Sequence, residues 1–417
     1  MDFEDIRPYT DLEFKEAYYR LMDDRRFQDA ITMCIPNYSV DQFRKDFTNF
    51  NTVEEVQRDF DKRFVDSFIA QSSKGVTLTG IENINDDNAY MFIANHRDIT
   101  FDPALLQYYF FIEQRKTSRI AVGDNLFATP LLDEIAKVNK MIKVKRSGTM
   151  REKLENSQKL AAYIQKSIFE DNESVWIAQR DGRTKDGNDF TKHGLVKMLT
   201  LGNHDNLIDF LRRMKITPVT VSYEIEPCDK LKARELAISE HTVYHKKPGE
   251  DFESIKQGIF SPKGRIALTI GTTIDKELDT IPTDISNNDQ LQHVCQLIDK
   301  QIYKNYTLFP NNYIAHDLLH QNEDYSEFYT PEEKTAFEQY LQMKSRVEDV
   351  SEEKMRENLL KIYATPVDNH YKTITEENEP FLTHYGRTTT PVATENFNYS
   401  TEFHWRYRVN HTCRESS

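Results

Sequence analysis

The sequence lacks any long hydrophobic segment. Its longest apolar runs, such as residues 108–112 (YYFFI), fall far short of the roughly 20 residues that a helix needs to cross a bilayer. The first residues, MDFEDIRPYTD, are acidic and contain no apolar core, so they do not resemble a secretory signal peptide. With 38% hydrophobic and 29% charged residues, the 417-residue chain is typical of a globular protein with a substantial core. We therefore expect an intracellular protein that does not span a membrane.

Cysteine is also scarce. The four cysteines, Cys34, Cys228, Cys295 and Cys413, have neither the close spacing of a zinc site nor the pattern of a disulfide framework. They are expected to be free thiols in a reducing compartment. Histidine, cysteine and carboxylate residues do not group as ligands along the sequence, so we expect no bound metal and no cofactor.

A general excess of basic residues is absent as well. The formal net charge of -14 argues against a general nucleic-acid-binding protein. One stretch departs from this balance, because residues 137–197 contain 14 Lys and Arg against 8 Asp and Glu, a net charge of +6. A basic stretch in an acidic chain indicates either an anionic ligand or membrane surface, or a set of solvated helix faces. Charge alone leaves both interpretations open.

The hydrophobic pattern changes along the chain. Residues 1–73 place apolar side chains three and four residues apart, which predicts a helical N-terminal region. Over residues 74–284, short apolar runs alternate with helical stretches, which is typical of an α/β domain with helices covering a mainly buried sheet. Residues 285–364 are again helical in pattern, and residues 365–417 form a polar tail that we expect to be partly disordered. The predicted strands are 76–80, 89–94, 141–145, 174–178, 216–223 and 265–270, and the clearest helices within the domain are 150–169 and 191–214.

The first block of chemical interest is NHRDITFD, residues 95–102, directly after the predicted strand 89–94. His96 is expected just past the carboxyl end of that strand, where open α/β sheets bind ligands. Asp102 precedes Pro103 and a helix-like run, so it is suited to cap that helix. A capping carboxylate can also hold an imidazole in one tautomer, so a structural and a catalytic role for Asp102 are compatible.

Two further blocks follow the same strand-then-loop design. GDNLFATPLLDEIAKVNKMIKVKRSG (123–148) carries Lys145 and Arg146 beyond a short strand. VWIAQRDGRTKDGND (175–189) carries an Arg-Asp-Gly-Arg loop after a strand with a tryptophan. Glycine lets the backbone approach a ligand, and an arginine side chain can donate two parallel hydrogen bonds to phosphate oxygens. An exposed polar turn is the simpler interpretation of residues 185–187. A fourth block, ITPVTVSYEIEPCD (216–229), by itself indicates only a core strand.

Taken in this order and spacing, the four blocks resemble the glycerophosphate and lysophosphatidate acyltransferase superfamily. That family has an N-H-x-x-x-x-D box, a G…R box, an E-G-T-R or G-G-R box, and a strand with a proline. NHRDITFD, GDNL…VKR, WIAQRDGR and ITPVTVSY occupy those places here. The resemblance covers roughly residues 75–275. It implies a mixed, mainly parallel sheet flanked by helices, as in the soluble glycerol-3-phosphate acyltransferases of plastids, which also have a helical N-terminal domain.

The resemblance also implies an O-acyltransferase of phospholipid biosynthesis. His96 is then the general base that takes a proton from a glycerol hydroxyl as it attacks an acyl thioester of coenzyme A or acyl carrier protein. The acceptor is glycerol 3-phosphate, its 1-acyl form or another lysolipid. The expected location is cytoplasmic, with peripheral contact to an anionic membrane surface. The residues expected to bind the acceptor are Arg146 and Arg183, with Arg180, Lys145 and Gly182 as further candidates.

The chain departs from the family pattern in its His–Asp spacing. Five residues separate His96 from Asp102 where the family has four, and Asp98 is only two residues away. A one-residue bulge would keep the pairing with Asp102, which is followed by proline as in the family. We therefore predict that Asp102 orients His96, with Asp98 as the alternative. The longer spacing leaves an alternative function, a lipid- or acyl-carrier-binding protein without turnover. The sequence disfavours a kinase and a serine hydrolase, because it has neither a phosphate-binding Gly-x-x-x-x-Gly-Lys-Ser/Thr loop nor a Gly-x-Ser-x-Gly elbow.

Overall fold

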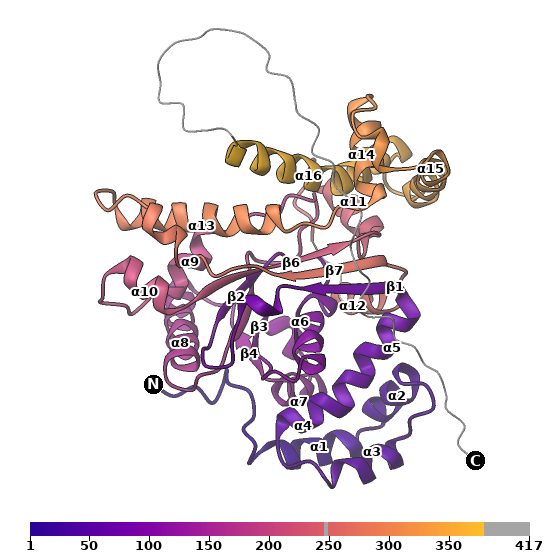
Figure 1. Ribbon diagram of the computed structural model, residues 1–417. Coiled ribbons are helices and arrows are strands. Elements are labelled where there is room, and N and C mark those ends of the chain that lie inside the picture. The colour runs from indigo at the N-terminus through magenta and orange to yellow at the C-terminus, as the bar shows by residue number, and fades with distance from the viewer. Residues whose placement is uncertain (246–248, 379–417) are drawn as a thin grey trace, which may run out of the picture. The chain divides into compact units, whose positions relative to one another are not determined.

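The computed structural model describes residues 1–245 and 249–378, so the tail predicted from residue 365 lies mostly outside the described residues. A seven-stranded sheet runs through the middle of the described part (Figure 1). Its strands lie in the order β1-β7-β6-β2-β5-β3-β4. Their bounds are β1 Ser73–Thr79, β2 Met91–Ala94, β3 Arg119–Gly123, β4 Met141–Val144, β5 Val175–Ala178, β6 Ile216–Tyr223 and β7 Gly264–Ile270.

Every neighbouring pair of strands is parallel except β6 with β7. The strands β6, β2, β5, β3 and β4 therefore point the same way, and their carboxyl ends meet at one edge, which we name the catalytic edge. The predicted α/β fold with a mixed, mainly parallel sheet is confirmed. β3 was not predicted, because its apolar run is only a few residues long and leads directly into the turn of the second block.

Helices cover both faces of the sheet, and side chains alternate between the two cores. In β2, Met91 and Ile93 face one core while Phe92 faces the other, which explains its uninterrupted apolar run. The first core is covered by α8 Met150–Phe169, α9 His193–Leu199, α10 Leu207–Arg213 and α13 Asn287–Lys304 (Figure 1). The second is covered by α5 Lys62–Ser72, α6 Phe101–Ile112, α7 Pro130–Val138 and α12 Glu250–Phe260.

One predicted helix is two helices in the structure. The prediction of a helix over 150–169 is confirmed by α8, whereas 191–214 is split into α9 and α10. Gly202 in the intervening turn has φ +79°, a conformation that ends a helix and favours glycine. Asn206 then starts α10 by accepting hydrogen bonds from the backbone amides of Ile208 and Asp209.

The N-terminal helices enclose an aromatic core of their own. Phe43 and Phe60 stack at its centre with ring centroids 3.8 Å apart, and Phe14, Tyr18 and Phe47 pack around them. Burial of such large rings stabilises this layer against the sheet domain. The elements are α1 Phe14–Asp23, α2 Arg25–Cys34, α3 Val40–Phe47, α4 Val53–Val56, a π-helical turn Gln57–Asp61, and α5.

The C-terminal helices form a fourth core together with α11 Asp229–Ser239. They are α14 Pro310–His320, α15 Pro331–Ser345 and α16 Glu352–Asn378. Helix α16 continues past residue 364, where the sequence pattern predicts the tail to begin, because Val367 and Thr373 still have buried side chains to pack. Short 3₁₀ turns lie at Ile81–Asn83, Asp124–Phe127, Glu277–Thr280 and Ser326–Phe328.

Among the residues that the structure describes, no helix is long and apolar enough to cross a membrane. Cys34, Cys228 and Cys295 are buried free thiols, and Cys413 lies outside the described residues.

Candidate active site

His96 lies just beyond the carboxyl end of β2, where the sequence predicts it. Its carbonyl oxygen accepts a hydrogen bond from the amide of Thr184 at 2.7 Å, which joins it to the loop after β5. The ring of Trp176 meets the imidazole edge to face, with centroids 5.9 Å apart. The side chain of His96 is 15% exposed, so the ring is held on most sides but still open to a ligand.

Asp102 is the carboxylate that contacts His96. Nδ1 of the ring lies 2.8 Å from Asp102 Oδ2, and the same oxygen accepts hydrogen bonds from the amides of Arg97 and Asp98 at 2.6 and 2.9 Å. A carboxylate can only accept, so Nδ1 of the neutral ring carries the proton and Nε2 has a free lone pair. This tautomer is the one that a general base at the catalytic edge requires.

Asp98 instead accepts hydrogen bonds from backbone amides at the start of helix α6. Its Oδ1 accepts hydrogen bonds from the amides of Thr100 and Phe101, both at 2.8 Å. The expectation that Asp102 caps this helix is wrong, because the N-cap position is Thr100 and Asp102 lies in the first turn. The extra residue between His96 and Asp102 is taken up by the Asp98 turn. It does not make a bulge in β2, whose register with β5 and β6 is regular.

Tyr223 contacts Oδ1 of Asp102, the carboxylate oxygen that does not face His96. It is the last residue of β6, and its hydroxyl donates to Asp102 Oδ1 at 2.7 Å. Burial, together with the neighbouring Asp102 carboxylate, raises the pKa of Tyr223 well above its ordinary value, so the hydroxyl stays a donor. By itself the sequence of this block indicates only a core strand, and its match to the fourth family motif gives no role to Tyr223. The available signal was a hydroxyl-bearing aromatic residue at the carboxyl end of that strand.

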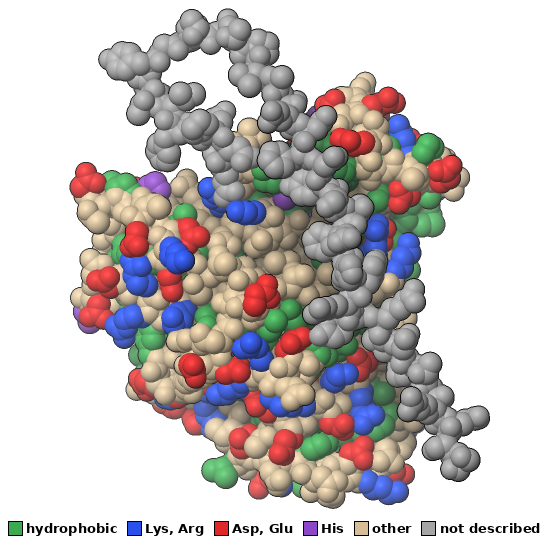
Figure 2. Space-filling view, in the orientation of Figure 1, with side chains coloured by type: hydrophobic (Ala, Val, Ile, Leu, Met, Phe, Trp, Pro, Cys, Tyr) green, Lys and Arg blue, Asp and Glu red, His purple; other side chains and the backbone are tan. Residues whose placement is uncertain are grey.

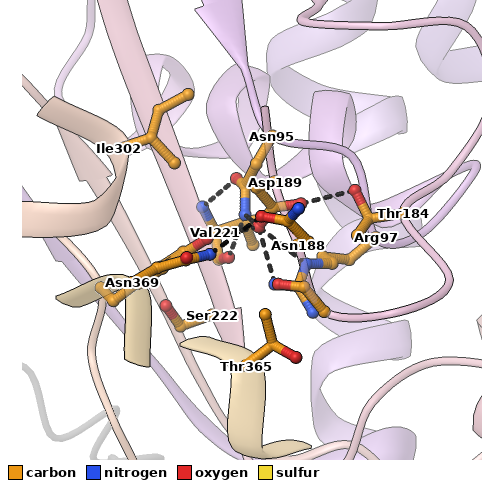
Figure 3. A network of polar contacts seen from close by, with 12 residues as sticks. Asn95, Arg97, Thr184, Asn188, Asp189, Val221, Ser222, Ile302, Thr365 and Asn369 are labelled. Carbon is orange, nitrogen blue, oxygen red and sulfur yellow. Dashed lines mark hydrogen bonds and ion pairs between the residues drawn. The ribbon is translucent and has the colours of Figure 1, made fainter. Parts of the chain in front are cut away.

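A buried polar network surrounds Asn95 and Arg97, the residues on either side of His96 in the chain (Figure 3). Arg97 donates from Nε and Nη2 to Asp189 Oδ2 at 3.0 and 2.7 Å, and its Nη1 lies 3.2 Å from Glu226 Oε2. Although burial raises the pKa of Asp189, the Arg97 guanidinium holds it below its ordinary value. The carboxylate therefore stays ionised opposite a permanently charged partner. Asp189 also accepts hydrogen bonds from Asn95, Thr184 and Tyr306.

The network ties three parts of the chain together. Asn95 exchanges hydrogen bonds with the backbone of Val221 in β6, at 3.0 and 2.8 Å. Helix α16 packs on the loop after β5, because a Cβ on Gly187 would lie 2.4 Å from the carbonyl oxygen of Ile362. Asn369 of α16 donates to Asn188 of the same loop at 3.2 Å (Figure 3). Neither Arg97 nor Asp189 was singled out from the sequence, since a buried ion pair between distant residues leaves no local pattern.

Arg183 is the best placed of the predicted phosphate ligands. Its Nη1 is buried and has no hydrogen-bond partner among the described residues. A buried guanidinium N–H without a partner is costly, so its position favours an anionic ligand. Gly182 before it has φ +71°, and no other atom lies within 4 Å of where its Cβ would be. The left-handed turn therefore leaves open space beside the arginine.

Arg146 reaches the same edge from β4. Its guanidinium packs on the backbone of Gly123, where an added Cβ would lie 3.2 Å from Cζ. Its Nε is 3.8 Å from Asp181 Oδ1, so it lies beside the loop that carries Arg183. Half of the Arg146 side chain is exposed, which makes it a weaker anchor than Arg183.

The other two predicted cations are engaged elsewhere. Lys145 forms an ion pair with Asp5 of the N-terminal segment. Arg180 lies over the ring of Phe190, 4.8 Å from its centroid, and donates to the carbonyl of Asn188 at 3.4 Å. Both side chains are therefore held by partners other than His96.

Much of the basic stretch is paired with acidic side chains. Five of its lysines form ion pairs with carboxylates. On the face of the molecule seen in Figure 2, basic and acidic side chains are interspersed. These pairs are Lys143–Asp133, Lys145–Asp5, Lys159–Asp5, Lys166–Asp171 and Lys185–Glu235. Four of these lysines pair with carboxylates outside residues 137–197, so part of the net charge of +6 is offset in the fold.

Comparison with known proteins agrees with this geometry. Residues 75–223 match the family model described as acyltransferase, and no match was found among curated proteins. The matched region runs from β1 to the end of β6 and includes both His96 and Tyr223. O-acyl transfer is the chemistry that such a domain supports. Residues 75–223 of this chain are thus a domain of the acyltransferase family.

Proposed function

We propose that the protein transfers a fatty acyl group from a thioester of coenzyme A or acyl carrier protein to a hydroxyl of glycerol 3-phosphate or 1-acyl-glycerol 3-phosphate. The observation that carries this proposal is the pairing of His96 with Asp102 at the same edge of the sheet as Arg183. A base and an anion-binding group at one edge suit an acceptor that has both a hydroxyl and a phosphate.

In the proposed reaction, Nε2 of His96 takes the proton of the acceptor hydroxyl as its oxygen attacks the thioester carbonyl. Asp102 stabilises the resulting imidazolium, and Tyr223 with two backbone amides holds Asp102 in place. Collapse of the tetrahedral intermediate breaks the carbon–sulfur bond, and the departing sulfur takes the proton from His96. The products are an ester and a free thiol, and no acyl-enzyme is formed.

The acceptor's phosphate is proposed to bind Arg183, with Arg146 as the second contact. Guanidinium groups suit phosphate because they can donate two parallel hydrogen bonds. Arg183 supplies a buried donor with no partner in the described part of the chain, and Arg146 approaches from the neighbouring loop. Gly182 is proposed to let the backbone come close to the phosphate.

The alternative of a binding protein without turnover rests on the longer His–Asp spacing. The Asp98 turn takes up the additional residue, and the His96–Asp102 contact is kept at 2.8 Å. This contact supports the enzyme over the binding protein.

Peripheral contact with the cytoplasmic face of a membrane is part of the proposal, because a 1-acyl acceptor would be drawn from a lipid surface. The start of α8 supports it through apolar side chains, since Met150 is 84% and Leu154 53% exposed. Of the two basic residues between them, Arg151 is paired with Glu155, so Lys153 is the basic residue offered to an anionic surface there. Each basic residue near an anionic surface contributes about 1 kcal/mol. Flotation with anionic vesicles should show binding at low salt that weakens at high salt. Absence of binding at low salt would remove this part of the proposal.

A single assay panel tests the reaction. Purified protein is given acyl-coenzyme A or acyl carrier protein as donor, with glycerol 3-phosphate, its 1-acyl form or unphosphorylated glycerol as acceptor. Thiol release and ester formation are measured together. We expect equal amounts of both products, with a phosphorylated acceptor far better than glycerol. Thiol release that does not need an acceptor would indicate a thioesterase, and no release from any pair would favour the binding protein.

A further inference from the structure

Two C-terminal helices bring three metal-ligating side chains together, away from the residues of the proposed reaction. His316 and His320 lie on α14, and Asp368 lies on α16. One ligand atom from each lies within 4.8 Å of the other two. The sequence analysis expected no such group, because Asp368 is 48 residues beyond His320 in the chain. Folding brings it next to the histidines.

The spacing of the two histidines suits a shared ligand. Residues four apart lie one above the other on a helix face, and paired histidines with this spacing are a common metal-binding arrangement. The two rings are close, with centroids 4.4 Å apart. Nε2 of His316 lies 3.2 Å from Asp368 Oδ1. Two ligand atoms bound tetrahedrally to one zinc ion are roughly 3.4 Å apart for bonds of about 2.1 Å, so this pair needs little movement.

His316 is also oriented as a metal ligand. The residue is buried, and its Nδ1 has no hydrogen-bond partner in the described part of the chain. The carboxylate of Asp317 lies 3.6 Å from Nδ1 and is held by the amide of Tyr325 and the hydroxyl of Tyr329. A carboxylate behind the distal nitrogen of a ligating histidine favours the tautomer that directs the other nitrogen at the metal.

We propose that His316, His320 and Asp368 bind one divalent transition-metal ion, with Zn²⁺ as the best match to two imidazoles and one carboxylate. Three protein ligands leave the fourth position to water. The all-oxygen coordination that Mg²⁺ and Ca²⁺ prefer is not provided by this donor set.

Such an ion would join α14 to α16. Helix α16 contacts the loop after β5 through Ile362 and Asn369, and that loop carries Asp189, the partner of Arg97. Asn369 directly follows the ligand Asp368 in the chain. The ion therefore has a structural role, fastening the C-terminal helices to the loop that supports the site. It takes no part in the acyl transfer proposed above, and the metal-site proposal does not depend on that function.

The test uses the full chain after removal of metal with a chelator. Zn²⁺ is titrated calorimetrically, and Co²⁺ is titrated by its visible absorption. The variants are His320→Ala and Asp368→Asn, both at exposed positions, so their metal-free melting temperatures should equal that of the wild type. His293→Ala is the matched control, because His293 is an exposed helical histidine outside the cluster.

We expect the wild type and His293→Ala to bind one equivalent of Zn²⁺. The two ligand variants should bind Zn²⁺ about 100-fold more weakly. Even residues that only support a metal site contribute about 10- to 100-fold to metal affinity, so loss of a ligand should reach the upper end of that range. The melting temperature should rise with Zn²⁺ in the first pair and stay constant in the second. The Co²⁺ complex should show the strong visible absorption of four-coordinate Co²⁺. Absence of stoichiometric binding by the wild type, or equal binding by the ligand variants, would overturn the proposal.

Discussion

Charged groups at the catalytic edge differ in whether they have protein partners. In the loop after β2, Asp102 accepts from His96, two backbone amides and Tyr223, and Arg97 is paired with Asp189 of the loop after β5. Elsewhere in the loop after β5, Arg183 has a buried donor without a partner among the described residues. The difference is what the proposed chemistry needs. A base must be oriented before substrate arrives, whereas a group that binds an anion must keep donors available for it.

The largest expected effect is that of removing the base. His96→Ala should lower kcat about 100- to 10,000-fold, because general-base catalysis contributes that much. The fold should be unchanged, since the ring borders solvent and its backbone contact to Thr184 does not need the side chain. Circular dichroism checks the fold, and His204→Ala, at an exposed histidine of the α9–α10 turn, is the control. A variant with near-wild-type kcat would remove the catalytic assignment.

The next effect concerns the buried polar network around Arg97. Arg97→Met should lower the free energy of unfolding by about 3–5 kcal/mol, because it leaves Asp189 buried without its cation, whereas Glu226 keeps its ion pair with Lys232. Adding Asp189→Asn should restore part of that loss. Urea denaturation of the three proteins gives the comparison. If Arg97→Met unfolds at the wild-type urea concentration, the network does not stabilise the catalytic edge.

Burial of the Lys263 side chain should make the stability of the protein depend on pH. Its ammonium is fully buried over the ring of Phe101, and burial lowers its pKa to about 8 from 10.5. Between pH 8 and 10.5 the folded state binds fewer protons than the unfolded state, so the stability of the wild type rises with pH relative to Lys263→Met. The gain should be about 3 kcal/mol across that window. A stability difference that does not change with pH would show that Lys263 titrates normally.

The smallest effect is expected at the proposed anion-binding arginines. Arg183→Ala should raise the KM for the phosphorylated acceptor about 10- to 100-fold, because a hydrogen bond to a charged group contributes about 1.5–3 kcal/mol. Arg146→Ala should have a smaller effect, since its side chain is half exposed, and Arg180→Ala is the control. Arg183→Lys should restore only part of the affinity. If the donor KM rises while the acceptor KM does not change, the arginines bind the thioester's phosphates instead.

Local patterns predicted the sheet and the position of His96. Buried apolar runs marked six of the seven strands, and a histidine after β2 marked the catalytic edge because parallel strands end together. The helix cap was assigned to the wrong aspartate. Asp98 and Asp102 both precede the apolar run of α6, and only the course of the loop decides which carboxylate meets the free amides.

Long-range contacts could not be predicted in this way. Tyr223 meets Asp102 across 121 residues, and Arg97 meets Asp189 across 92. Their pairing depends on strand order, which hydrophobic periodicity does not specify. Similarly, His316 and His320 give a recognisable spacing, but Asp368, the third proposed ligand, comes from a helix that the sequence pattern did not extend that far.

The central claim is that Asp102, and not Asp98, holds His96 in its reactive tautomer. The most direct test compares kcat for Asp102→Asn and Asp98→Asn, measured side by side with saturating donor and acceptor. Asparagine at position 98 can still accept the amides of Thr100 and Phe101, so we expect that variant to stay within a few-fold of the wild type. Asparagine at position 102 removes the negative charge opposite Nδ1, and kcat should fall by about 100-fold or more. An inactive Asp98→Asn beside a fully active Asp102→Asn would contradict the account.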